Sequence, residues 1–156
     1  MKGIPKIIET LNLLLADELT AVSQYMVHSE MCDNWGYTRL HKAVEARAVD
    51  EMKHAEKLIG RIIFLDGKPV VSKIHPMQIG VSVEAQLEHD FEAEAGAIAS
   101  YNTAIKEAAE LGDNGTRDLL THILLEEEAH IDWLETQKDQ IDQMGIQIYL
   151  SLQAKE

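Results

Sequence analysis

Two copies of a glutamate and histidine pattern are the residues of this sequence that could do chemistry. Glu51 lies three residues before His54, and Glu127 lies three residues before His130. Within a helix, residues three apart project from the same face, so each pair would present an oxygen beside a nitrogen. Carboxylate and imidazole are common ligands of transition metals. We therefore predict that each pair lies on a helix and binds a metal ion.

Each Glu-x-x-His segment is preceded by a further glutamate at the same distance. The interval in sequence from Glu18 to Glu51 equals the interval from Glu94 to Glu127. One constant offset, the step from Glu18 to Glu94, therefore carries the first half of the pattern onto the second; we call it the repeat offset. The complete set of candidate ligands is Glu18, Glu51, His54, Glu94, Glu127 and His130.

The composition favours one all-α domain. Hydrophobic residues make up 46% of the 156 residues, whereas there are only nine glycines and three prolines. That balance suits long helices better than many short strands. The length is enough for one domain with a sizeable core, so we expect residues 1–156 to form a single domain.

Charge and cysteine content restrict the partners and the compartment. The formal net charge of −13 argues against nucleic acid or an anionic membrane as a partner and favours cations, although acidic composition also serves solubility alone. Cys32 is the single cysteine, which excludes an intramolecular disulfide and fits a reducing compartment. The first residues lack the apolar run of a signal peptide, and no run is long enough to span a bilayer. We expect a cytoplasmic protein.

Apolar residues spaced alternately by three and four positions predict four long helices. We expect the first at about residues 4–33, ended by Gly36, and the second at about 38–65. Ser82 should cap the third helix, and Thr116 should open the fourth, which closes at about residue 144. Residues 146–152 are expected to form a short fifth helix.

The segment between the second and third helices predicts how the helices connect. It carries two prolines and two glycines and has no helical period up to Val81. A connector of this length can return along a bundle. We therefore expect two antiparallel hairpins joined by a long crossover.

Hairpin geometry predicts that the candidate ligands converge. The midpoint between Glu18 and Glu51 falls between residues 34 and 35, and that between Glu94 and Glu127 falls between residues 110 and 111; both are predicted turns. At a rise of about 1.5 Å per residue, an error of two residues would displace partners by only about 3 Å. Solvated surface charges are the alternative interpretation. However, these residues occupy core-facing positions, where unpaired carboxylates would each cost several kcal/mol, which predicts cations between them.

Four carboxylates and two imidazoles suit two metal ions, with one carboxylate from each Glu-x-x-His helix bridging them. Iron or manganese fits best, because zinc more often recruits cysteine or accepts four ligands, and magnesium and calcium prefer oxygen alone. Such ligation leaves the divalent and trivalent states accessible. We therefore expect a metal pair that dioxygen or peroxide oxidises.

The sequence resembles a bacterioferritin, a haem-containing member of the ferritin-like superfamily, over essentially its whole length. The segments that carry the resemblance are Asp50-Glu51-Met52-Lys53-His54-Ala55, His130-Ile131-Asp132-Trp133-Leu134-Glu135-Thr136, Trp35-Gly36, Leu40, and Ile63-Phe64-Leu65 followed by Gly67-x-Pro69. The fold implied is a ferritin-like four-helix bundle with a short C-terminal helix. By this resemblance Glu51 and Glu127 bridge two irons, and the terminal ligands are Glu18 with His54 and Glu94 with His130.

The resemblance also implies a function. The chain would be a ferroxidase that oxidises Fe²⁺ with dioxygen or hydrogen peroxide, and it would store and detoxify iron as ferric mineral inside a cage of about twenty-four subunits. The cage would be a homo-oligomer or a mixture with a second subunit type, and a ferredoxin-type protein would act as reductant. Some family members carry a His and Asp pair on the inner surface where this chain has Ala46 and Asp50, so an accessory iron site there is not implied.

Met52 is the residue through which the resemblance implies haem b. It lies about 100° around the helix from Glu51, away from the bundle interior, where it could meet a twofold-related copy of itself. In the family, two such methionines ligate one haem iron between subunits. The residues that could line the haem pocket are Leu19, Val22, Ser23, Met26 and Val49. The alternative is a methionine that fills an ordinary subunit contact.

Two other functions are compatible with the same residues. One is a diiron or dimanganese enzyme without storage, such as a rubrerythrin-like peroxidase or a manganese catalase, which would be a much smaller particle. The other is a non-catalytic helical oligomer in which the acidic residues bind a structural cation. The remaining histidines have no partner at ligand spacing and are predicted to be surface or connector residues: His28, His41, His75, His89 and His122.

Overall fold

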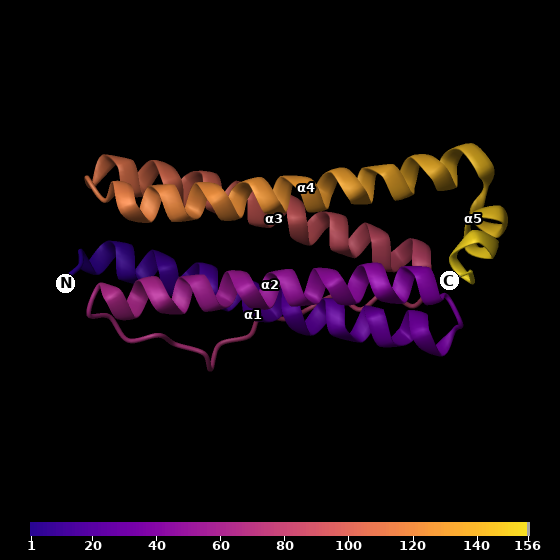
Figure 1. The fold of residues 1–156 in the computed structure, drawn as a ribbon, viewed down its shortest axis with the longest axis horizontal. Helices are drawn as coiled ribbons and strands as arrows, with labels where there is room; N and C mark the ends of the chain where they lie inside the picture. Colours follow the sequence, from indigo (N-terminus) through magenta and orange to yellow (C-terminus); the bar gives the residue numbers. More distant parts are fainter. Residues whose placement is uncertain (156) are drawn as a thin grey trace.

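The computed structural model describes residues 1–155, which form five helices (Figure 1). The helices are α1 (Pro5–Asn34), α2 (Thr38–Phe64), α3 (Val83–Glu110), α4 (Asn114–Met144) and α5 (Ile146–Gln153). α1 packs chiefly against α2, and α3 packs chiefly against α4, so two antiparallel hairpins lie against each other while α5 crosses one end of the bundle. The predicted all-α bundle with a short fifth helix is confirmed. Within residues 1–155, no helix is both long and apolar enough to cross a membrane.

The helix ends follow from local chemistry. Gly36 and Gly145 adopt φ values of 81° and 80°, which residues with a side chain rarely adopt, and they end α1 and α4. Ser82 caps α3 as predicted, because its Oγ accepts the Ala85 N–H at 3.2 Å. The predicted start of α4 at Thr116 is wrong by two residues. The helix begins at Asn114 because the Asp113 carboxylate accepts the Thr116 N–H at 3.0 Å and so acts as the cap.

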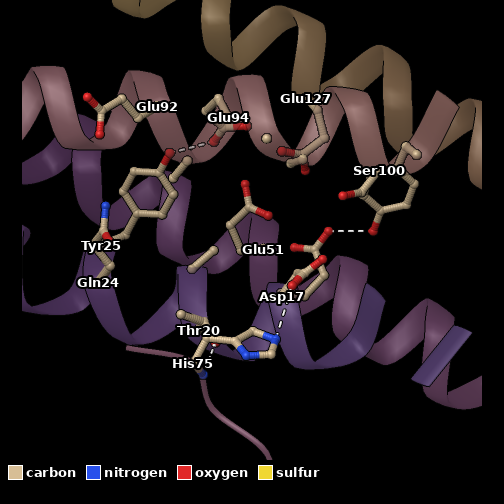
Figure 2. Close-up of a pocket in the computed structure, with 16 residues that line it drawn as sticks. Asp17, Thr20, Gln24, Tyr25, Glu51, His75, Glu92, Glu94, Ser100 and Glu127 are labelled. Atoms are coloured by element: carbon tan, nitrogen blue, oxygen red, sulfur yellow. Dashed lines mark hydrogen bonds and ion pairs between the residues drawn. The ribbon is translucent and has the colours of Figure 1, made fainter. Parts of the chain in front are cut away.

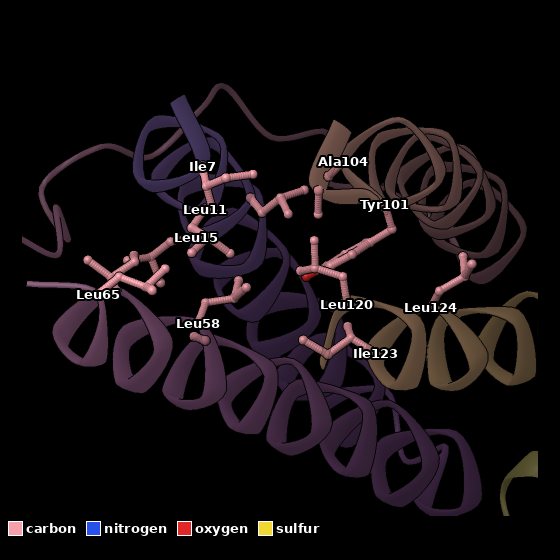
Figure 3. Packing of buried hydrophobic residues seen from close by; sticks show 14 residues of the cluster. Ile7, Leu11, Leu15, Leu58, Leu65, Tyr101, Ala104, Leu120, Ile123 and Leu124 are labelled. Atoms are coloured by element: carbon pink, nitrogen blue, oxygen red, sulfur yellow. The ribbon is translucent and has the colours of Figure 1, made fainter. Parts of the chain in front are cut away.

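Apolar residues gather in two large clusters along the bundle, with a smaller one beside the second. The first contains Leu11, Leu15, Leu58, Tyr101 and Ile123, all at most 1% exposed (Figure 3). The second, nearer α5, is formed by Cys32, Leu40, Val83, Leu87, Leu134 and Tyr149. On each of the four long helices, the candidate metal ligands fall between the residues of these clusters. The two large clusters therefore hold the helices in register above and below the polar layer.

The connector between α2 and α3 follows α1 in an extended conformation. Its backbone N–H groups donate to four side chains of α1 at distances of 2.8 to 3.3 Å. The acceptors lie at intervals of eight, four and four residues, so they share one face of the helix. The donor and acceptor pairs are Val70 with Asn12, His75 with Thr20, Gln78 with Gln24, and Gly80 with His28. The predicted crossover is therefore hydrogen-bonded to α1 along much of its length.

His28 does not lie at the surface, and the prediction for this residue is wrong. Its side chain is fully buried, and its Nε2 accepts the Gly80 N–H at 3.0 Å. Nδ1 therefore carries the ring hydrogen and donates a hydrogen bond to Asp90 Oδ1 at 2.9 Å. Gln24 Nε2 also donates to Asp90 Oδ1, at 2.9 Å. This buried network joins α1, the connector and α3.

Candidate metal centre

The six predicted ligands meet in the middle of the bundle. Every one is at most 3% exposed, although all six are polar or charged. The imidazole rings of His54 and His130 lie stacked, with centroids 6.1 Å apart. The contributing elements are α1 for Glu18, α2 for Glu51 and His54, α3 for Glu94, and α4 for Glu127 and His130. The convergence expected from the hairpin midpoints is confirmed.

The ligand atoms form two overlapping groups of four. In each group, one donor atom per residue lies within 4.8 Å of the others. The first group is Glu18, Glu51, His54 and Glu127, and the second is Glu51, Glu94, Glu127 and His130. Glu51 and Glu127 belong to both groups. Two adjacent metal positions that share two carboxylates have this arrangement of donors.

Unpartnered polar atoms indicate that the centre is built around ions. Within residues 1–155, the buried atoms without a hydrogen-bond partner include Glu18 Oε2, Glu51 Oε1, Glu94 Oε2, Glu127 Oε1 and His130 Nδ1. Yet His130 Nδ1 lies 3.0 Å from Glu51 Oε1, and His54 Nδ1 lies 2.7 Å from Glu127 Oε1. Close approach without hydrogen-bond geometry is expected when donor atoms point at a common centre, because a metal ion would satisfy them. The residues therefore fit a pair of metal ions.

Two buried tyrosines orient the two carboxylates that belong to only one group. Tyr25 on α1 donates its hydroxyl hydrogen to Glu94 on α3 at 2.5 Å. Tyr101 on α3 donates to Glu18 on α1, also at 2.5 Å. The repeat offset that relates the ligands also relates these two tyrosines. Each hairpin therefore orients a ligand that belongs to the other hairpin.

The Nε2 atom of each histidine, which we call its outer nitrogen, also contacts a carboxylate on the other hairpin. His54 Nε2 on α2 lies 2.5 Å from Glu126 Oε2 on α4, and His130 Nε2 on α4 lies 3.2 Å from Asp50 Oδ2 on α2. A carboxylate at one ring nitrogen fixes the ring orientation and directs the other nitrogen at the metal. The sequence reasoning missed these contacts. The available signal was that Asp50 and Glu126 each precede a ligand glutamate and are themselves related by the repeat offset.

Basic residues in turn contact Glu126 and Asp50, the two carboxylates at the outer histidine nitrogens. Lys57 Nζ lies 3.5 Å from Glu126 Oε1, and Arg47 Nη1 lies 3.8 Å from Asp50 Oδ2. Arg47 also stacks over Trp133, with its guanidinium carbon 5.6 Å from the ring centroid. Asp50 therefore already contacts Arg47 and His130. This agrees with the sequence analysis, in which Ala46 and Asp50 do not imply an inner-surface iron site.

The pKa shifts of the centre describe how protons balance its charge when metal is absent. Burial, reinforced by Glu51, raises the pKa of Glu18 well above its ordinary value. Burial, together with Glu94 and Glu51, likewise raises the pKa of Glu127 to about 11. Burial would lower the pKa of His130, but Glu51 and Glu94 outweigh it and raise that pKa to about 9. Metal ions must therefore displace protons from the centre when they bind.

Met52 lies on the outer face of α2, away from these ligands. Its side chain is 44% exposed, and two residues of the predicted haem pocket, Val49 and Met26, are 40% and 54% exposed. The prediction that Met52 faces away from the bundle interior is confirmed. An exposed group of apolar side chains is typical of a surface that binds another molecule.

A cavity of about 290 Å³ lies between α1 and α3 and reaches the ligands (Figure 2). Glu51, Glu94 and Glu127 line its buried part, and Asp17 and His75 line its outer part. The sequence reasoning did not predict a role for His75, because this residue belongs to the connector and the distance to Asp17 in the sequence is large. The cavity therefore extends from partly exposed side chains to the buried carboxylates.

Comparison with known proteins identifies similar chains. The ferritin-like domain family matches residues 8–144. A bacterioferritin of Brucella melitensis is 44% identical over 154 residues, which cover 99% of this chain and 96% of the relative. One of Rhodobacter capsulatus is 40% identical over 154 residues, with the same coverage. One of Mycolicibacterium paratuberculosis is 40% identical over 149 residues, which cover 96% of this chain and 94% of the relative.

Proposed function

The chain belongs to the bacterioferritin family, and from this membership we propose that it oxidises Fe²⁺ at the buried centre and stores the ferric product. The protein is an iron-storage ferroxidase. The observation that carries this function is the pair of ligand groups that share Glu51 and Glu127, because a shared pair of carboxylates holds two redox-active ions at one site. Iron is the substrate as well as the occupant of the centre.

Each of the six residues has a defined role in the proposal. Glu51 and Glu127, which belong to both ligand groups, would help to hold both irons. Glu18 with His54 would hold one iron, and Glu94 with His130 would hold the other. Hard carboxylate oxygens stabilise the ferric state, while imidazole nitrogen binds the ferrous state well, so the mixed ligand set supports both.

The bound iron pair supplies two electrons, which with two protons reduce dioxygen to hydrogen peroxide, or hydrogen peroxide to two water molecules. The chain's own residues position the ions. Apolar clusters on both sides bury the six ligand residues, which strengthens their electrostatic interactions. Tyr25 and Tyr101 keep the two terminal carboxylates in fixed orientations as the charge of the centre changes.

The test is oxidation of Fe²⁺ added to metal-free protein under air, followed by ultraviolet absorbance. Wild-type protein should show a fast phase at about two Fe²⁺ per subunit, because each subunit contains one two-ion centre. Glu127→Ala combined with His130→Ala should remove the fast phase. An unchanged fast phase in this double variant would contradict the proposed centre.

We propose that Met52 ligates haem b shared with a second subunit. The support is that Met52 is exposed on α2 and that Val49 and Met26 are exposed as well, because a porphyrin could cover such apolar side chains. A thioether is a suitable axial ligand for haem iron. The same methionine from a twofold-related subunit would complete the coordination.

We propose that the subunits assemble into a closed cage of about twenty-four copies. Large apolar side chains on several helices stay exposed in the single chain, among them Leu13, Phe64, Leu125 and Ile148, each at least 50% exposed. Such residues on a single chain are typical of surfaces that neighbouring subunits cover. Each subunit would contribute one domain, residues 1–156. Whether a second subunit type joins the cage, and whether a ferredoxin-type protein reduces its contents, stay predictions, as does a cytoplasmic location.

A further inference from the structure

The cavity between α1 and α3 joins partly exposed side chains to buried ones. At its outer end, the side chain of Asp17 is 44% exposed and that of His75 is 51% exposed. At its inner end, Glu18 and Glu94 are 3% and 2% exposed. Asp17 also immediately precedes Glu18 on α1. The outer end of the cavity and its first buried ligand, Glu18, therefore come from consecutive residues of α1.

Buried carboxylate oxygens in the cavity indicate that it suits a cation. Glu18 Oε2 and Glu94 Oε2 both lack a hydrogen-bond partner among the described residues, and both glutamates line the cavity. Figure 2 shows the Glu94, Glu51 and Glu127 carboxylates gathered at its inner end. Unpartnered buried carboxylate oxygens attract cations strongly.

His75 and Asp17 place a nitrogen and an oxygen together at the outer end of the same cavity. His75 Nε2 lies 3.3 Å from Asp17 Oδ1 (Figure 2). Nitrogen and carboxylate oxygen together suit Fe²⁺ and similar divalent transition metals, and water can complete the coordination of a partly exposed ion. Two protein ligands give a weaker site than the six of the buried centre.

The connector holds His75 in this position by its backbone. The His75 N–H donates to Thr20 Oγ1 at 2.9 Å, and the Thr20 hydroxyl donates to the Ala16 carbonyl at 2.8 Å. Further attachments lie on both sides, at Val70 to Asn12 and at Gln78 to Gln24. His75 is therefore presented to the cavity by an anchored segment, so little conformational entropy is lost when it binds an ion.

We propose that Asp17 and His75 form an outer binding site for a divalent transition metal, which receives Fe²⁺ before it passes to the buried centre. This inference rests on the proposed function, because it supplies the ferroxidase with its substrate. The site binds strongly enough to raise the local Fe²⁺ concentration and weakly enough to release the ion inward, as a step along a conduction path requires.

The direct test is anomalous diffraction from crystals soaked with Zn²⁺, which accepts nitrogen and oxygen ligands and does not change oxidation state. Wild-type crystals should show a peak between Asp17 and His75 in addition to the peaks at the buried ligands. His75→Ala should lose the outer peak and keep the buried ones. Buried peaks with no outer peak in the wild type would overturn this inference alone, whereas missing buried peaks would contradict the proposed function.

Steady-state kinetics tests the role of the outer site in delivery. His75→Ala and Asp17→Asn should each raise the KM for Fe²⁺ about fivefold and leave kcat at saturating Fe²⁺ nearly unchanged, because they remove binding and not the oxidation step. The double variant should resemble either single variant, because both remove one site. Thr20→Val should raise KM in the same direction, because it removes the anchor of His75 and keeps both ligands.

The matched control is His122→Ala. His122 is also an exposed histidine beside an aspartate, with Nδ1 3.7 Å from Asp118 Oδ2, but it does not line the cavity. Its substitution should change neither KM nor kcat. An unchanged KM in both His75→Ala and Asp17→Asn would overturn the delivery role.

Discussion

Tyr25 on α1 donates a hydrogen bond of 2.5 Å to Glu94 on α3, and its counterpart Tyr101 on α3 donates one of 2.5 Å to Glu18 on α1. Each of these ligands is thus oriented by the hairpin to which it does not belong. The metal centre therefore depends on how the two hairpins dock, and neither hairpin alone contains an oriented ligand set.

Removal of either tyrosine hydroxyl should weaken the centre. Tyr25→Phe and Tyr101→Phe should each slow the fast phase of Fe²⁺ oxidation by about tenfold, because loss of a group that orders a ligand typically costs that much in affinity or activity. Stopped-flow absorbance measures the rate. Tyr37→Phe, outside the centre, should have no effect. Full activity in both variants would show that the two carboxylates do not need these bonds.

The carboxylate at the outer nitrogen of His54 should matter in the same way. Glu126→Gln keeps the size of the side chain but removes the charge that fixes the His54 imidazole. We therefore expect the metal ion held by His54 to bind about tenfold more weakly. Equilibrium binding of Co²⁺, followed by its visible absorbance, measures the change. The exposed neighbour Glu128 supplies the control variant, Glu128→Gln, which should bind Co²⁺ normally. Equal affinities of the two variants would exclude a role for Glu126.

Replacement of the proposed haem ligand should abolish haem binding without loss of the fold. Met52→Leu preserves volume and apolar character but provides no sulfur atom, so protein purified with haem available should lose the Soret band. Met144→Leu, at the far end of α4, is the control and should retain it. Normal haem content in Met52→Leu would refute the assignment.

Asp113 should contribute stability that depends on pH. Burial opposes its ionisation, but Thr116 and Arg61 outweigh burial and lower the pKa of Asp113 below the ordinary value of 3.8. A lowered folded-state pKa gives stability that is present above pH 3.8 and is lost as the pH falls through the lowered value. Asp113→Ala should reduce the free energy of unfolding at pH 7 by about 1–2 kcal/mol, because the helix cap is lost.

Urea unfolding of wild type and Asp113→Ala, followed by circular dichroism, measures this difference. The difference should shrink at the acid end of the range in which the protein stays folded. Asp118→Ala, an exposed position on the same helix, should cost little at any pH. A difference that did not change with pH would mean that the Asp113 charge adds nothing to the cap.

The particle size distinguishes storage from a non-storage diiron enzyme. A closed cage should elute from a size-exclusion column at about twenty-four times the chain mass of 17.5 kDa. Light scattering on the same peak gives the mass without a shape assumption. Elution as a monomer or dimer at all protein concentrations would contradict the cage and favour a peroxidase or catalase.

The helices, and the common height of the six candidate ligands along the bundle, could be predicted from the sequence because both depend on local rules. Apolar spacing predicts helices, and the distance of a residue from a turn sets its height in a hairpin. The candidate ligands were recognisable because charged residues at core-facing positions are costly unless a cation compensates them. The start of α4 was less predictable, because both Asp113 and Thr116 are good cap residues and only the contacts decided between them.

The contacts around the ligands depend on the tertiary structure. Tyr25 with Glu94, His54 with Glu126, and His75 with Asp17 each join elements far apart in the sequence, and no local spacing predicts such pairs. The burial of His28 was missed for the same reason, since its partners lie on the connector and on α3.

By itself, the sequence determined which six residues are candidate metal ligands and that two hairpins carry them, because helical periodicity and turn positions are properties of short segments. The docking of the hairpins and the path of the connector decided which side chains contact those candidate ligands and where a cavity reaches them. These features depend on packing between distant segments, which only the folded chain brings together.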